Sequence, residues 1–510
     1  MKPDDLYNAV TDLRDEQILE GEKRLRPKRT AYARRLGAIA AMLAVLLLAS
    51  VFLMPKLTRP QMTTESASPS ADPVLENPTD PLALPNPSAF RLATASYPQM
   101  VAFANEKDYL RQDGTIDPSY DAAYKAWADS RSEIRPTGDY SQGLDVYFHA
   151  VLPVLLGETD AKNCVVSPMN LYLALAMLAE TTAGESRQEI LDLLHAADLK
   201  TLRTQANAVW RANYNDDGVI TSILASSLWL RDDQRYREDT VQTLADDYYA
   251  SVFSGPMGEQ EYDATLRDWM NEQTGELLED QIAGIAFDPN TVMSLVTTAR
   301  YNAPWQDPFE KTEERSFYTP TQELTTTFLT DSDFDMTCYF GEHFTAAAKP
   351  VKIGAGKMYF LLPHEGVTPE ELLTQEETIS FLSGEAGRSQ TSHREVILTL
   401  SVPQFDVSSQ LALEDSLKKL GIEKVFDPAQ ADFSPLMKES APTYLSEVTH
   451  GARVQIDQEG IQAAAYTMLG VYGAAEPPQE RVDLILDRPF LFVHTNSDGL
   501  PLFVGIVNEP

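Results

Sequence analysis

Cysteine is nearly absent from this sequence, which has only Cys164 and Cys338 among 510 residues. Two cysteines cannot build the disulfide framework on which many small secreted domains depend. Neither residue has the spacing of a metal ligand, and both lie in apolar or strand-like surroundings, so we predict two separate buried thiols. No Asn-x-Ser/Thr acceptor remains once those blocked by proline are discarded, which fits a bacterial origin.

Basic residues are also few. Lysine and arginine together number 41 against 76 aspartates and glutamates, which gives a net charge of −35 and a pI near 4.5. A surface this acidic repels phosphates and argues against nucleic acid as a partner. Solubility is the simplest explanation of the charge.

Motifs for metal binding and catalysis are missing as well. Asp331, Asp333, Asp335 and Glu342 have the acid spacing of an EF-hand calcium loop, but Met336 stands where that loop needs glycine. Histidines are scattered without an HExxH pattern, at His343, His364, His393, His450 and His494. No glycine-framed serine nucleophile occurs either. The sequence therefore predicts no enzyme, no metal site and no cofactor.

A long uncharged run lies near the N-terminus. Residues 23–35 carry seven basic side chains and no acid, and residues 36–54 are uncharged. At about 1.5 Å per helical residue, the uncharged run approaches the roughly 30 Å of a bilayer's apolar core. We predict a transmembrane helix over 36–54, with a cytoplasmic tail at 1–35 and the rest of the chain outside the cell. A cleavable signal peptide, which would give a secreted protein, is the alternative.

Proline marks the next boundary. Eight prolines punctuate residues 55–94, which indicates an extended and stiff linker. From residue 95 the composition becomes that of a globular domain, which we expect to continue to residue 510. Helix patterns dominate the first half of this domain and strand patterns the second. The predicted class is therefore α+β with a large mixed sheet.

Several segments show the helix and strand patterns clearly. An amphipathic helix is expected from Gly143 to Gly157, with Pro153 disturbing its last turn. Ser167 and Pro168 suit the start of a second helix, which is apolar on nearly every side and must be central. Ser167 is better explained as the cap of that helix than as a catalytic serine. A further helix should end at Gly275. Strands are expected at 163–166, 226–230, 297–309, 357–363 and 396–403.

The segment 457–478 has an unusual composition. Between Glu459 and Glu476 it has neither charge nor proline, although acids and prolines crowd both ends. As a strand, it would turn small or apolar residues to one face: Ile461, Ala463, Ala465, Thr467, Leu469 and Val471. Such a segment is too poor in bulk for an ordinary core strand and too apolar for a permanent loop. It suggests a segment that is exposed in one state and inserted in a sheet in another, with a plain helix as the alternative.

The sequence around this segment favours the switching strand. Ser167-Pro168 with the helix after it, and the segments 305–309, 398–405 and 445–507, resemble the serpin family, and the resemblance covers roughly residues 95–510. It implies three β-sheets, about eight to nine helices and an exposed reactive-centre loop. With the N-terminal features, the chain looks like a membrane-anchored bacterial member of that family.

The resemblance also implies a function. Members of the family inhibit serine proteases as suicide substrates: the protease cleaves the loop, and the freed loop inserts into the main sheet before the acyl-enzyme hydrolyses. We therefore expect an inhibitor of extracellular serine proteases, whose partner is held in a covalent complex. A non-inhibitory serpin that acts as a binding scaffold is the alternative.

Site residues follow from the same resemblance. The hinge of the loop would comprise Glu459, Gly460, Ile461, Gln462, Ala463, Ala464 and Ala465. A count of fifteen residues from Gly460 places the cleaved bond at Ala474-Ala475, with Tyr472-Gly473 as the rival. An alanine in the donor position suits elastase-like or subtilisin-like proteases with shallow pockets, and a tyrosine suits a chymotrypsin-like protease.

A polar cluster is expected where the main sheet parts. Its members would be Ser167, Asn170, Thr297 and His450, and Trp305 would lie near the top of the sheet. The sequence departs from the family's usual residues at four places, where Asn170 replaces serine, Thr297 asparagine, Gln458 glutamate and Ile461 threonine. Ile461 is still uncharged and β-branched, so we expect loop insertion to survive.

Overall fold

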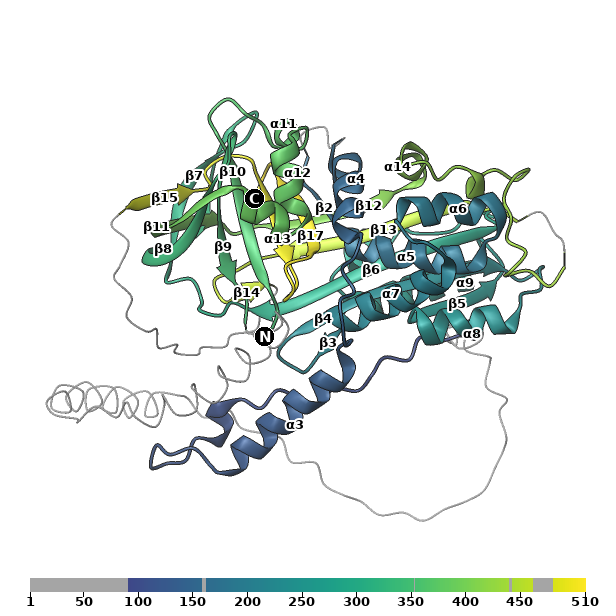
Figure 1. Cartoon of the computed structure of the whole chain (residues 1–510), viewed down its shortest axis with the longest axis horizontal. Helices are drawn as coiled ribbons and strands as arrows, with labels where there is room; N and C mark the ends of the chain where they lie inside the picture. Colours follow the sequence, from purple (N-terminus) through teal and green to yellow (C-terminus); the bar gives the residue numbers. More distant parts are fainter. Residues whose placement is uncertain (1–89, 158–161, 353, 440–442, 462–479) are drawn as a thin grey trace, which may run out of the picture. The chain divides into compact units, whose positions relative to one another are not determined.

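The computed structural model of this chain describes residues 90–157, 162–352, 354–439, 443–461 and 480–510 (Figure 1). The predicted cytoplasmic tail, the predicted transmembrane segment and the linker up to residue 89 lie outside the described residues. Within the described part, no helix is both long and apolar enough to cross a membrane. This finding stands against the predicted single-pass membrane localisation, which is withdrawn.

Twelve α-helices occur in the described residues. Eight of them have at least eight residues: α3 (Ser119–Ile134), α4 (Leu144–Leu156), α5 (Pro168–Thr181), α6 (Gly184–Leu193), α7 (Leu199–Asn213), α8 (Glu238–Asp247), α9 (Gln260–Thr274) and α12 (Glu376–Ser383). The other four have four to six residues: α10 (Glu279–Ile282), α11 (Pro369–Leu372), α13 (Glu385–Gln390) and α14 (Glu414–Lys419). The 3₁₀ helices are η2 (Glu106–Tyr109) and η3 (Lys424–Phe426).

The first sheet carries the candidate site. Its strands run in the order β1 (Arg91–Ala93), β5 (Ala250–Gly255), β4 (Thr221–Arg231), β6 (Met293–Pro304), β13 (Glu447–Gln455) and β12 (Asp406–Ala412). Two short strands join it, β3 (Asn215–Asp216) beside β4 and β14 (Gly460–Ile461) beside β6. Strand β6 is antiparallel to β4 but parallel to β13, and β4 is parallel to β5, so the sheet is mixed and β6 and β13 form one of its two parallel pairs.

The second sheet is a continuous ladder in the order β15 (Arg481–Ile485), β11 (Ser392–Pro403), β8 (Glu323–Phe340), β9 (Phe344–Pro350), β10 (Lys357–Pro363), β16 (Phe490–Thr495), β17 (Pro501–Val507) and β2 (Cys164–Val166), with β7 (Lys311–Tyr318) beside β8. The long strand β8 joins two parts of this ladder. Its first half pairs with β7, and its last residues pair with β9. The predicted three sheets are seen as the first sheet and these two parts.

Helix α5 occupies the centre of the domain, as the sequence predicts. Ser167 caps it by accepting a hydrogen bond from the Asn170 N–H (3.4 Å), and Pro168 opens its first turn, where a missing N–H costs nothing. Every residue of α5 is buried. Helix α4 continues through Pro153 to Leu156, and Gly275 ends α9 in the left-handed conformation that was expected of it.

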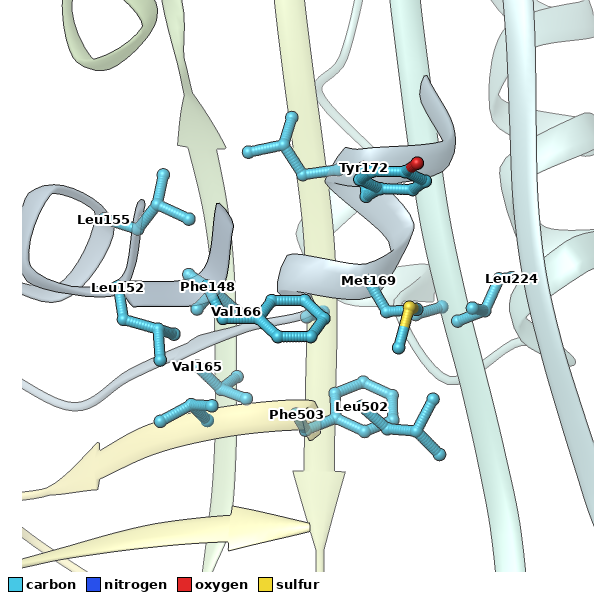
Figure 2. Packing of buried hydrophobic residues seen from close by; sticks show 14 of the residues in the cluster. Phe148, Leu152, Leu155, Val165, Val166, Met169, Tyr172, Leu224, Leu502 and Phe503 are labelled. Carbon is cyan, nitrogen blue, oxygen red and sulfur yellow. The ribbon is translucent and has the colours of Figure 1, made fainter. Parts of the chain in front are cut away.

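The core joins α4 and α5 to both sheets. Figure 2 shows Phe148 and Leu152 of α4 and Met169 of α5 among side chains of β2, β4 and β17. Burial of each large apolar side chain stabilises the fold by about 1.5–3 kcal/mol. Cys164 and Cys338 are both buried free thiols in different strands, which confirms the prediction made for them.

Three elements near the start of the described chain were not predicted. Strand β1 lies in the last residues of the expected linker and adds an edge to the first sheet through β5. The 3₁₀ helix η2 and helix α3 follow it. Only Trp127 and Ile134 of α3 are buried, so this helix lacks the strong apolar periodicity that identifies helices in sequence.

Candidate functional site

The seam between β6 and β13 is the centre of the candidate site. Residues Ser294 to Ala299 of β6 pair in parallel with Glu447 to Ala452 of β13. The seam is short because β6 continues to Pro304 and there meets β14 instead. The predicted strand in 297–309, which was expected to leave into a turn, is seen as β6, which ends at Pro304, and the residues after it turn toward β7.

The predicted polar cluster lies across this seam. His450 of β13 is 1% exposed, and its Nδ1 lies 2.8 Å from the Thr297 Oγ1 on β6. Its Nε2 accepts a hydrogen bond from the Ser167 N–H at 3.0 Å. Since Nε2 is an acceptor, a neutral His450 carries its proton on Nδ1 and donates it to Thr297. One imidazole therefore joins β13, β6 and the start of α5.

Asn170 completes the set that the structure brings together. Its Nδ2 donates to the backbone oxygen of Thr298 at 2.8 Å, which adds a second link between α5 and β6. Three buried polar atoms near the seam have no hydrogen-bond partner among the described residues: Asn170 Oδ1, Ser226 Oγ and Thr298 Oγ1. Each such group costs about 1–3 kcal/mol, so the closed seam stores unfavourable free energy.

Burial controls the charge of His450. Loss of hydration disfavours the imidazolium and lowers the pKa of His450 to about 4. The ring is therefore neutral at pH 7, as its acceptor role toward Ser167 requires.

The hinge begins directly after β13. Asp457 makes the turn, because its Oδ1 accepts the N–H groups of Glu459 at 2.8 Å and Gly460 at 2.9 Å. Gly460 then pairs with Pro304 and Ile461 with Ala303, antiparallel to β6, and Ile461 also bridges Ile456. A turning point at Gly460 was expected, but the role of Asp457 was not, although an aspartate three residues before a glycine is a usable signal.

Trp305 and Phe309 hold this hinge. The Trp305 N–H donates to the Glu459 oxygen and its indole Nε1 to the Asp457 oxygen, both at 2.9 Å. Phe309 exchanges two hydrogen bonds of 2.9 Å with Gln458, one to its backbone oxygen and one from its side-chain amide. Trp305 thus lies beside the hinge at the end of β6, and Phe309 is a contact that sequence analysis did not assign.

The rest of the predicted loop lies outside the described residues. This applies to hinge residues 462–465, to the bond Ala474-Ala475 and to its rival Tyr472-Gly473. The chain resumes at residue 480 and forms β15, which pairs in parallel with β11 of the second sheet. The segment between Ile461 and Glu480 therefore connects the two sheets.

Three acids of the calcium-like spacing, Asp331, Asp333 and Asp335, belong to strand β8, and Glu342 follows the end of that strand. Asp331 forms an ion pair with Lys349 of β9, and its Oδ1 accepts the Glu310 N–H at 2.9 Å. Among the described residues, no group of three or more His, Cys, Asp or Glu side chains is placed to hold a metal ion.

Comparisons with known proteins find similarity to one protein family. The family model "Serpin (serine protease inhibitor)" matches residues 150–510. Plasminogen activator inhibitor 1 of Neovison vison is 27% identical over 371 residues, which cover 68% of this chain and 88% of that protein. Alpha-1-antitrypsin 1-1 of Mus musculus is 26% identical over 373 residues, which cover 70% and 85%.

Solved structures share the fold at low sequence identity. The thermophilic serpin tengpin in its native state superposes with a TM-score of 0.65 and 21% identity, covering 74% of this chain and 96% of that one. AtSerpin1 of Arabidopsis in its native stressed conformation gives a TM-score of 0.64 and 20% identity, covering 74% and 100%. These matches confirm the α+β fold class. The finer prediction of a membrane-anchored bacterial type finds no support in them.

We expect acid to weaken the fold through His450. The unfolded chain binds this proton at its ordinary pKa of 6.5, whereas the folded protein binds it only near pH 4. The contribution is therefore complete above pH 6.5 and is lost as the pH falls toward 4, by about 3 kcal/mol. His450→Gln cannot titrate, so its free energy of unfolding, measured in urea across this range, should fall less than that of the wild type.

Two comparisons make the measurement specific. Some pH dependence should remain in the variant, because burial also lowers the pKa of His494, to about 3. The exposed His343→Gln serves as the matched control and should keep the wild-type slope. Equal slopes for His450→Gln and the wild type would contradict the assignment.

Proposed function

The chain belongs to the serpin family of serine protease inhibitors, since the family model covers well over half of it, and on this basis we propose that it traps serine proteases as a suicide substrate. As a member of an inhibitor family, it is not an enzyme. In the proposed reaction the protease's serine oxygen attacks the carbonyl carbon of Ala474. The bond to the Ala475 nitrogen breaks, that nitrogen leaves with a proton, and an ester joins inhibitor and protease.

One observation carries this proposal, namely the direction of three strands. β6 and β13 run parallel to one another, whereas β14 is antiparallel to β6 and its Ile461 is bridged antiparallel to Ile456, next to β13. A strand that continued from Ile461 into the seam would therefore be antiparallel to both neighbours. Insertion would replace one parallel pairing by two antiparallel ones, which are slightly more stable per residue.

Two features of the site favour this insertion, namely the hinge residues already paired with β6 and the polar atoms without partners in the seam. Gly460 and Ile461 are already buried against the end of β6, so only the following residues would have to enter. The seam below holds buried polar atoms without partners, and its opening would give them new neighbours. The first residues of the cut loop can enter the seam because they are small and uncharged.

The proposed bond selects the class of protease. Alanine before the cleaved bond fits a shallow pocket of the elastase or subtilisin kind. Pancreatic elastase mixed with the chain should give a complex that survives boiling in detergent, with a mass equal to the sum of the two proteins less the released peptide 475–510. Mass spectrometry of the released peptide should find Ala475 at its N-terminus. A peptide that begins at Gly473 would point to the rival bond, and cleavage without a complex would contradict the proposal.

A substitution at the same bond checks the specificity. Ala474→Arg should transfer inhibition from elastase to trypsin, whose pocket carries an aspartate for a basic side chain. If trypsin cuts this variant without being trapped, while elastase is trapped by the wild type, Ala474 is not the donor residue.

Ile461 tests insertion apart from cleavage. Its side chain is 1% exposed at the point where the new strand would start. Ile461→Arg would bury an unpaired charge, which costs several kcal/mol, so the hinge should leave the edge of β6 and this variant should still be cut but form little complex. Ile461→Val is the matched control and should still trap the protease. Equal complex yields from both variants would rule out insertion through this hinge.

Thermal melting separates the inhibitor from a non-inhibitory scaffold. Nicking of the loop at Ala474-Ala475 should raise the melting temperature by at least about 10 °C, because the inserted strand adds hydrogen bonds and buried surface. The nick is made with a catalytic amount of elastase and checked by mass spectrometry. A scaffold whose loop stays outside the sheet would melt at the same temperature before and after.

A further inference from the structure

The segment that precedes the part matched by the family model packs against the first sheet, close to β3 and β4. Residues 90–149 precede the part matched by the family model, yet α3 and the chain before it contact the domain at several points. The Trp127 Nε1 donates to Asp217 Oδ2 at 3.0 Å, and the Phe103 N–H donates to the Asp217 backbone oxygen at 2.8 Å. These bonds fix the C-terminal half of α3 beside β3 and β4 (Figure 1).

Arg131 makes the contact of interest. Its Nη2 donates to the backbone oxygen of Gly354 at 2.7 Å, in the turn between β9 and β10, and its guanidinium lies 5.7 Å from the Trp127 ring centroid. Gly354 has φ +84°, and a Cβ on it would lie 2.1 Å from Arg131 Nη2. The guanidinium therefore fits against the bare backbone of a glycine.

The same turn contacts the C-terminal end of β6. The Lys352 N–H donates to the Pro304 oxygen at 3.0 Å, and the Tyr301 hydroxyl donates to the Ala355 oxygen at 2.7 Å. Val351 forms a bridge with Trp305. Tyr301, Pro304 and Trp305 are thus all tied to the turn that Arg131 holds.

This end of β6 is also where the hinge is attached. Pro304 pairs with Gly460, and the Trp305 N–H donates to the Glu459 oxygen. Beyond Ala299 the pairing of β6 with β13 stops, so the residues from Arg300 to Ala303 present the edge that an incoming strand would meet after Ile461. Any motion of the turn displaces this edge.

We infer that Arg131 is a positioning residue for loop insertion, which acts through the turn at Gly354 and holds the end of β6 as a fixed template. The inference rests on the proposed function, because it concerns the step after cleavage. Insertion competes with hydrolysis of the acyl-enzyme, and a template that moves slows insertion without touching the bond that is cut. Loss of the contact then turns more of the inhibitor into ordinary substrate.

Two substitutions remove the contact from opposite sides. Arg131→Ala deletes the donor, and Gly354→Ala places a methyl group where the guanidinium lies. Lys125→Ala is the control for the first, since it deletes a cation of the same helix whose ion pair with Asp129 is exposed. Gly366→Ala is the control for the second, since Gly366 has φ +83° and nothing within 4 Å of its Cβ position.

The readout is the number of inhibitor molecules consumed per protease molecule, titrated with the protease that the wild type traps. Arg131→Ala and Gly354→Ala should each raise this number about fivefold, which corresponds to about 1 kcal/mol, the net contribution of a typical hydrogen bond. The initial rate of loop cleavage should stay unchanged. Both controls should behave as the wild type, and Arg131→Lys, which keeps one donor, should fall between.

The outcomes separate two kinds of failure. If the wild type traps no protease, the proposed function fails and the titration cannot be made. If the wild type traps protease and Arg131→Ala consumes no more inhibitor than Lys125→Ala does, the positioning role is overturned. A lower melting temperature in both the intact and the nicked forms of Arg131→Ala, with an unchanged titration, would show a purely structural contact.

Discussion

The parallel pairing of β6 with β13 is the constraint on which the rest of the site depends. The chain that leaves β13 reverses at Asp457, so the residues that follow it run antiparallel to β6 and are bridged antiparallel to the end of β13's continuation at Ile456. The turn at residues 457–460 therefore places Gly460 and Ile461 beside the end of β6. Helix α5 lies against the same strands through Ser167 and Asn170. The seam can open only if the contacts of these two residues are broken or exchanged.

Polar groups on the seam act in two opposing ways. His450 stabilises the closed sheet, because one neutral ring bonds to Thr297 and to Ser167. The unpartnered oxygens of Thr298 and Asn170 destabilise it. An apolar seam would close more tightly and would gain less from a new strand. The mixture of satisfied and unsatisfied groups is what makes the proposed insertion favourable without making the intact protein unfold.

Local patterns explain which parts were predictable from sequence. Helix α5, its cap at Ser167 and the end of α9 at Gly275 follow from signals within a few residues, and all were predicted. The cluster around His450 came from family resemblance, because its members lie more than 100 residues apart in the chain. The contact of Arg131 with Gly354 spans 223 residues and belongs to a helix with little apolar periodicity, so neither pattern nor resemblance could find it.

The hinge is anchored from two directions, and the anchors fix register. From one side the turn held by Arg131 secures Pro304 and Trp305. From the other, the Lys349 ammonium lies 4.3 Å from the Phe309 ring centroid and pairs with Asp331, while Phe309 bonds to Gln458. A strand that slipped by one residue would turn its other face inward and bring Ala464 and Tyr466 into the space meant for Ala463 and Ala465. Because Gly460 and Ile461 are paired before any cleavage, the proposed strand can enter in only one register, and the small face of the segment meets the sheet.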